Sequence, residues 1–162
     1  MAHSQWPIVW KRDVPAFQCR ATCHRPYVLL PDAVHDGSDR GIIVHEGRYL
    51  IARRKAGVHL GGLWEFPGGK RETGETLEEC LHRELREELN VRIGLPTPFQ
   101  VVRHEYPEKI VELHFFCCRI ETGVAIALDC AELRWVYPHE MAAFEFPSAD
   151  QPIIAALQQG KV

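Results

Sequence analysis

The sequence predicts an α+β domain built on a mixed β-sheet with few helices. The chain has 162 residues, a usual size for one domain with a sizeable core. Several short segments are rich in Val, Ile and Phe or alternate apolar with polar residues, as strands do. Few segments have helical periodicity, and no internal repeat or interdomain linker separates the elements.

The first residues, 1–26, precede the domain, which we place at 27–162. They combine prolines with large aromatic residues, so we expect an N-terminal extension that packs on the domain. Within it, Cys19, Cys23 and His24 suggest zinc, but a structural zinc site needs four ligands and no fourth is in view. Unpaired thiols are the alternative interpretation.

Strands are expected on both sides of the glycine-rich middle of the chain. The segment 41–54 has the pattern of a hairpin that turns at Glu46-Gly47, and 27–31 that of a strand before it. Further strands are expected at 98–106, 109–120 and 132–137.

Helices are expected in the middle and at the end of the chain. Leucine spacing predicts a helix over 77–89, where Thr76 can act as N-cap and Glu79 completes a capping box. A short helix is expected near Pro138, and a longer one over 148–159, where a glycine ends it.

Bulk properties exclude several classes of function. A net charge of −3 provides no basic footprint for a nucleic-acid polymer. No apolar run approaches the roughly 20 residues that cross a bilayer, and the start lacks a signal peptide's apolar stretch. Six cysteines without a secretory signal predict reduced thiols, a cytoplasmic location and no membrane partner.

The predicted helix over 77–89 carries carboxylates on its apolar face. Glu84 and Glu88 fall within the apolar stripe and Glu87 lies at its edge, where burial without a partner is costly. A solvated face is the usual interpretation of a Glu-rich helix, but these side chains lie on the wrong side for it. They need a cation or raised pKa values, and dense oxygen ligands suit Mg²⁺ or Mn²⁺. The stripe consists of Leu77, Cys80, Leu81, Leu85 and Leu89.

The segment before this helix suits a phosphate site. Gly68 and Gly69 let the backbone bend close, so that a carbonyl oxygen can join the metal ligands. Arg54 and Lys70 add positive charge for an anion. Magnesium held by a few carboxylates normally keeps positions for substrate phosphates, which makes phosphoryl chemistry the leading hypothesis.

In this region the sequence resembles the Nudix hydrolases. Their signature, Gly-x5-Glu-x7-Arg-Glu-aliphatic-x-Glu-Glu-x-Gly-aliphatic, is matched from Gly69 to Val91, with Asn90 in place of the last glycine. That position requires a left-handed conformation, for which Asn is the usual second choice. The stretches "LWEFPGGK", "HEYPEKIVELHFF" and "FPSADQPII" are similar to the MutT branch, so the resemblance covers roughly 40–158.

The resemblance implies an α/β/α sandwich with a mixed sheet and a set of site residues. The implied metal ligands are Glu84, Glu87, Glu88 and the Gly68 carbonyl. The implied catalytic residues are Glu84, Glu87, Arg83 and Glu75. The implied substrate contacts are Arg54, Phe66, Lys70 and Asp150. Glu75 would pair with Arg83 to brace the helix, and Arg54 would lie near the phosphates. Asp129 stands where some members carry a further acidic ligand or base.

The implied reaction is attack of water on the β-phosphorus of a nucleoside triphosphate, which releases the monophosphate and pyrophosphate. Mg²⁺, or Mn²⁺ in its place, would neutralise phosphate oxygens and lower the pKa of the attacking water. A glutamate must accept the proton, and the sequence does not choose between Glu84 and Glu87.

Asp150 stands where the MutT pattern has the asparagine that reads the base. The simpler interpretation is a carboxylate at a helix N-terminus. An ionised aspartate only accepts hydrogen bonds and would repel O6 of 8-oxoguanine, whereas a protonated one regains a donor. We expect base selection by Asp150, with an oxidised purine nucleotide such as 8-oxo-dGTP ahead of dCTP.

Two other functions stay open. One is hydrolysis of another pyrophosphate, such as a nucleotide sugar, a dinucleoside polyphosphate or a capped RNA end, although the charge disfavours long RNA. The other is a non-catalytic base-reading domain like that of adenine glycosylases, which loses signature acids that are all present here. The expected partner is a nucleoside triphosphate, bound by a monomer or homodimer.

Overall fold

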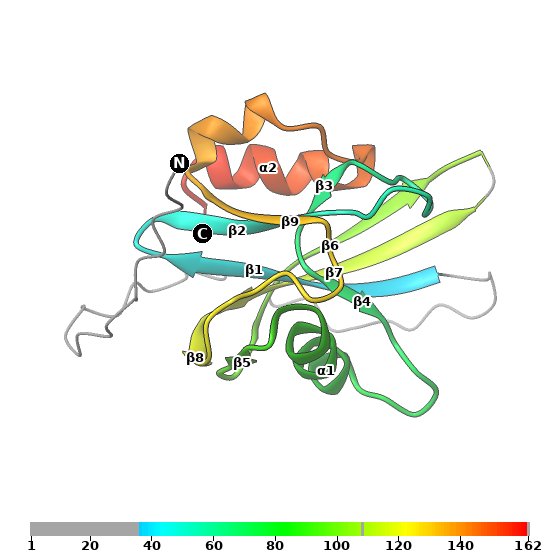
Figure 1. Cartoon of the computed structure of the whole chain (residues 1–162). Coiled ribbons are helices and arrows are strands. Elements are labelled where there is room, and N and C mark those ends of the chain that lie inside the picture. Colours follow the sequence, from blue (N-terminus) through cyan, green and yellow to red (C-terminus); the bar gives the residue numbers. More distant parts are fainter. Residues whose placement is uncertain (1–35, 108, 162) are drawn as a thin grey trace.

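The computed structural model describes residues 36–107 and 109–161 (Figure 1). The expected N-terminal extension with its candidate zinc ligands and the expected strand at 27–31 lie outside these residues. No helix in the described part is long and apolar enough to cross a bilayer. The described cysteines, Cys80, Cys117, Cys118 and Cys130, are free thiols.

A mixed β-sheet forms the centre of the domain. Its strands follow the order β3-β2-β1-β7-β6, with β4 beside β1 and β9 beside β2. β1 and β7 are parallel, whereas the other described pairs are antiparallel. These strands are β1 (Asp36–His45), β2 (Arg48–Arg53), β3 (Trp64–Glu65), β4 (Gly68–Lys70), β6 (Thr97–Glu105), β7 (Ile110–Cys118) and β9 (Glu132–Val136). A separate short ladder joins β5 (Arg92–Ile93) to β8 (Ile120–Thr122).

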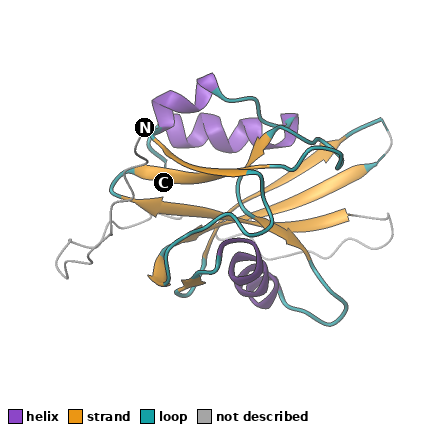
Figure 2. Ribbon diagram, in the orientation of Figure 1, coloured by secondary structure: helices purple, strands orange, loops and turns teal. Residues whose placement is uncertain are grey.

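Helices cover both faces of the sheet (Figure 2). α1 (Leu77–Leu89) packs on one face and α2 (Gln151–Gln158) on the other, as the expected α/β/α sandwich requires. Short 3-10 helices at Pro138–Ala143 and Ser148–Asp150 lead into α2.

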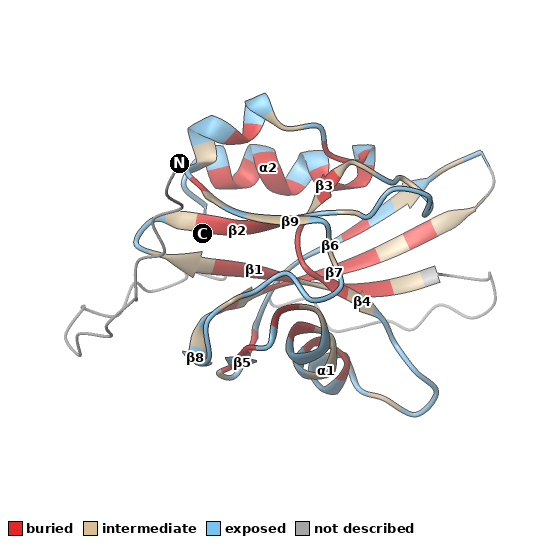
Figure 3. Ribbon diagram, in the orientation of Figure 1, coloured by how far each residue is buried: buried red, intermediate tan, exposed pale blue. Residues whose placement is uncertain are grey.

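Each face of the sheet has its own apolar core (Figure 3). Neighbouring strand residues point to opposite faces, so Ile43 packs with Leu81 and Leu85 of α1, whereas Ile42 packs with Ile153 of α2. The sheet is therefore held between α1 and α2, with one apolar core on each face.

The hairpin and α1 form where the sequence predicts them. The chain turns at Glu46 and Gly47, both with positive φ (49° and 75°), between β1 and β2. The bounds of α1 match the predicted helix. β1 begins at Asp36, earlier than the expected start at residue 41, and two short strands, β3 and β4, form in the glycine-rich middle of the chain, where no strand is expected.

Candidate active site

The ends of α1 are fixed by side-chain caps. The backbone N–H of Glu79 donates to Thr76 Oγ1 at 3.2 Å, and the Thr76 N–H donates to Glu79 Oε2 at 2.9 Å, which is the predicted capping box. At the other end, Asn90 has φ 58° and ψ 35°, the left-handed conformation expected of it. The carboxylates between these caps are therefore held at defined positions.

Arg83 joins the acidic residues of α1 to the turn before it. Its Nε and Nη2 donate to the two carboxylate oxygens of Glu75 at 2.7 and 2.9 Å, so the expected brace is present. Its Nη1 lies 2.8 Å from Glu84 and 3.4 Å from Glu87, and its Nη2 donates to the Lys70 carbonyl at 3.0 Å. The hydrogen bond from Arg83 is the main reason that the pKa of Glu75 falls to about 2.

Glu84 and Glu88 lie against the double-glycine turn. The Gly68 N–H donates to Glu88 Oε2 at 3.2 Å, and a Cβ on Gly69 would lie 2.2 Å from Glu84 Cδ. Burial raises the pKa of Glu88 to about 7, even though attraction to Arg40 opposes this shift. The carboxylates thus occupy the partly buried face that the helical periodicity predicts.

The donor set around this turn fits a hard divalent cation. It offers two carboxylates and the Gly68 carbonyl, with Glu87 (57% exposed) at the rim. No three carboxylate, imidazole or thiol groups of the described residues already converge on one point. Instead Arg83 binds Glu84 and Glu87, and Arg40 Nη1 donates to the Gly68 carbonyl. Ligation would require these oxygens to exchange their arginine partners for the ion.

A second charged cluster lies on the α2 side of β1. Arg54 Nη1 is 2.8 and 2.7 Å from the two oxygens of Glu65, and Arg40 Nη2 is 3.3 Å from Glu65. Asp150, 3% exposed at the start of α2, interacts electrostatically with Arg40, Glu65 and Arg54. Burial raises the pKa of Asp150 to about 7, against the attraction of Arg40.

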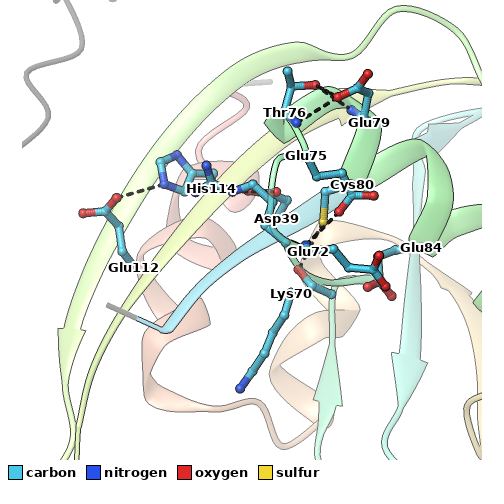
Figure 4. A network of polar contacts seen from close by, with 12 residues as sticks. Asp39, Lys70, Glu72, Glu75, Thr76, Glu79, Cys80, Glu84, Glu112 and His114 are labelled. Atoms are coloured by element: carbon cyan, nitrogen blue, oxygen red, sulfur yellow. Dashed lines mark hydrogen bonds and ion pairs between the residues drawn. The ribbon is translucent and has the colours of Figure 1, made fainter. Parts of the chain in front are cut away.

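Three of the expected site residues lie apart from these clusters. Phe66 is completely buried, and its side chain packs in the core against Phe115 and Phe146. The Asp129 carboxylate is 72% exposed and lies 2.5 Å from Lys55 Nζ. The Lys70 side chain is directed away from Glu84 and Cys80 (Figure 4).

The structure also places charged residues in the site that the sequence did not single out. Asp39 is completely buried beside Cys80, and its carboxylate lies 3.6 Å from Arg71 Nε. Arg40 and Glu65 belong to the second cluster. The pair Asp39-Arg40 directly precedes the apolar run from Gly41, so a longer predicted strand would have drawn attention to both.

Comparison with known proteins shows to which family the domain with the acidic helix α1 belongs. A sequence model described as the NUDIX domain matches residues 40–156. The chain belongs to the Nudix family. Within this Nudix domain, α1 and the turn before it carry the family signature that the sequence resembles.

Relatives and solved structures place the chain in the MutT-like part of the family. The 8-oxo-dGTP diphosphatase of Escherichia coli is 33% identical over 120 residues, which cover 74% of this chain and 93% of that protein. The CTP pyrophosphohydrolase of the same organism is 34% identical over 71% of this chain and 85% of its own length. A MutT protein structure from Methanosarcina mazei superposes with a TM-score of 0.68 at 25% identity, covering 78% and 94% of the two chains. The chain is thus a MutT-like Nudix hydrolase, a class that acts on phosphoric anhydrides.

Proposed function

We propose that this protein is a Mg²⁺-dependent nucleoside triphosphate pyrophosphohydrolase that releases a nucleoside monophosphate and pyrophosphate. The observation that carries the proposal is the placement of Glu84 and Glu88 against the Gly68-Gly69 turn, at the capped helix of a Nudix domain. Two carboxylates in such partly buried positions repel one another, and a divalent cation that takes the place of their arginine and N–H partners would offset that repulsion.

The side chains around the turn have distinct proposed roles. Glu84, Glu88 and the Gly68 carbonyl would hold the cation, with Glu87 at the rim. When bound, Mg²⁺ supplies neutralisation of phosphate oxygens and a lower pKa for the attacking water. Glu84 or Glu87 would accept the proton. Arg83 Nη1 contacts both carboxylates, Glu84 at 2.8 Å and Glu87 at 3.4 Å, and so holds them near one another.

For the substrate, we propose 8-oxo-dGTP first and a cytidine triphosphate second. The relatives named for 8-oxo-dGTP include proteins that match over most of their length. The second candidate is favoured by Asp150, since a carboxylate accepts a hydrogen bond from the cytosine amino group, and by the related CTP pyrophosphohydrolase. Asp150 is buried beside the arginines of the second cluster, which suits a residue that reads a base.

Analysis of the hydrolysis products in Mg²⁺ tests this proposal, with pyrophosphate the product expected from a triphosphate and UMP with glucose 1-phosphate that expected from UDP-glucose. The panel is 8-oxo-dGTP, dGTP, dCTP, CTP, dATP, UDP-glucose and diadenosine tetraphosphate, each with and without chelator. We expect metal-dependent release from triphosphates, led by 8-oxo-dGTP or dCTP, and a flatter ranking in Asp150→Ala. Preferred cleavage of UDP-glucose or diadenosine tetraphosphate contradicts the proposal, and so does nucleotide binding without hydrolysis, which would indicate a base-reading domain.

A further inference from the structure

Arg40 is a charged residue in β1, a strand whose following residues, Ile42 and Ile43, belong to the buried core. A Cβ added to Gly41 would lie 3.2 Å from Leu85 Cδ1, so residue 41 faces α1. Its neighbours in the strand, Arg40 and Ile42, therefore point to the α2 side. The Arg40 side chain is only 12% exposed. A guanidinium in such a place needs several partners, because burying a charge is costly.

The neighbours of Arg40 come from three elements. Glu65 of β3 lies 3.3 Å from Nη2, the Gly68 carbonyl of β4 accepts from Nη1, and Asp150 lies at the start of α2. Burial disfavours the charged guanidinium, but attraction to Glu65 and Asp150 outweighs it and raises the pKa of Arg40. Arg40 therefore stays charged between the glycine turn and Asp150.

The cluster is balanced in charge but not in hydrogen bonding. Arg40 and Arg54 face Glu65 and Asp150, two cations and two anions. Glu65 already accepts from both arginines, whereas Asp150 makes no helix-capping bond. A guanidinium carries more N–H donors than the two contacts of Arg40 use. Arg40 thus has spare donors and Asp150 has spare acceptors, and the two side chains are near enough to attract one another.

We infer that Arg40 donates a hydrogen bond to a carbonyl oxygen of the nucleobase while Asp150 accepts an N–H from the same edge. The inference rests on the proposed nucleotide substrate. It also resolves a difficulty with Asp150: an ionised aspartate only accepts, and Arg40 supplies the missing donor. Together the two residues offer one donor and one acceptor.

This pairing selects bases by their carbonyl groups. The 8-oxoguanine base presents its N7–H next to O6, and cytosine presents its amino group with N3 and O2 along one edge. Adenine has no carbonyl oxygen. Arg40 should therefore favour 8-oxo-dGTP and dCTP over dATP, and dATP provides an internal control for effects of Arg40 that do not involve the base.

The test replaces Arg40 with Met, with Arg48→Met as the matched control at the distant hairpin, where Arg48 pairs with Glu46. We expect Arg40→Met to lower kcat/KM about 10- to 100-fold for 8-oxo-dGTP and dCTP, the range for a lost charged hydrogen bond. For dATP the fall should be about 10-fold smaller than for these two nucleotides, whereas all values in Arg48→Met should stay within about 3-fold of wild type. Equal losses for all three nucleotides would place Arg40 at the phosphates or the metal and overturn the inference.

Calorimetric binding of 8-oxo-dGMP, dCMP and dAMP separates base recognition from turnover. We expect the wild type to discriminate against dAMP, Arg40→Met to lose this discrimination, and Arg40→Lys, which keeps the charge without the fork, to retain part of it. Discrimination without hydrolysis would refute the proposed function and support the inference. Discrimination that survives in a folded Arg40→Met protein, or that is absent from the wild type, overturns it. Thermal melting and circular dichroism check that each variant is folded.

Discussion

At the scale of single residues, two carboxyl groups distinguish this molecule. Burial raises the pKa of both Glu88 and Asp150 to about 7, although each has an arginine nearby. Desolvation therefore outweighs attraction at both positions, and each carboxyl group destabilises the metal-free fold once it ionises. Carboxyl groups with such raised pKa values are candidates for contact with a ligand or ion.

The Glu88 carboxyl group makes a pH-dependent contribution to stability that can be measured. Because its folded pKa lies above its ordinary value of 4.5, the folded state binds more protons than the unfolded state between those values. Its favourable contribution is complete below the unfolded pKa and is lost as pH rises through about 7. In chelator, Glu88→Gln should therefore raise stability at pH 8 by about 1–3 kcal/mol and change it little at pH 5.

Thermal melting of wild type and Glu88→Gln in chelator at the two pH values gives this comparison. Glu87→Gln is the matched control, because Glu87 is 57% exposed and should have little effect at either pH. A Glu88→Gln protein that is less stable than wild type at pH 8 would show that the carboxylate is well satisfied without metal.

Helical periodicity was sufficient to place Glu84 and Glu88, because a helix fixes which residues share a face. It could not reveal Arg40, whose role depends on contacts with β3, β4 and α2, three elements distant in the sequence. Phe66 was assigned by resemblance of its segment alone, which does not show that its side chain enters the core.

At the scale of elements, α1 was predictable because its signals are local. Thr76, Glu79 and Asn90 mark its ends, and its leucines mark the buried face. β3 and β4 were missed because they have two and three residues and contain the double glycine, so no period-two pattern can show in them. Their strand character comes from pairing with β2 and β1.

The C-terminal cap of α1 provides a test of the departure from the family signature. Asn90 holds the left-handed conformation at φ 58°, so Asn90→Gly should change stability by less than about 1 kcal/mol and leave turnover almost unchanged. Asn90→Ala, which adopts this conformation less readily, should cost about 1 kcal/mol. Urea denaturation measures both, and a tenfold loss of turnover in Asn90→Gly would indicate that Asn90 contacts the substrate.

The glycine turn should separate activity from stability. The nearest atoms to a Cβ on Gly69 are those of the Glu84 carboxylate, at 2.2–2.4 Å, and this flexible group can rotate away. Gly69→Ala should therefore cost less than about 1 kcal/mol of stability but reduce turnover at least about tenfold, because a proposed metal ligand is displaced. In Gly37→Ala the added Cβ lies 3.4 Å from Arg71 Nη2, an ordinary contact, so this control should keep its activity. Steady-state kinetics measure the turnover and urea denaturation measures the stability of each variant. A fully active Gly69→Ala protein would contradict the prediction.

At the scale of the whole molecule, the two cores place the site. The sheet is held between α1 and α2, and the proposed metal ligands lie where α1 meets β4. Asp150 is carried by the opposite layer, so the two charged clusters meet across β1 through Arg40. Strand and helix patterns predicted a mixed sheet, but its place between two helix layers was predicted only through resemblance, since the pairing of strands far apart in the chain has no local signal.

The central claim is that the carboxylates of α1 support metal-dependent release of pyrophosphate from nucleoside triphosphates. The most direct measurement follows the products of 8-oxo-dGTP and dCTP hydrolysis in Mg²⁺ by wild type and Glu88→Gln, both folded by circular dichroism. We predict monophosphate and pyrophosphate from the wild type, loss of activity in chelator, and a fall of at least about 100-fold in Glu88→Gln. Release of inorganic phosphate with a diphosphate product, or near-wild-type turnover in Glu88→Gln, would contradict the account.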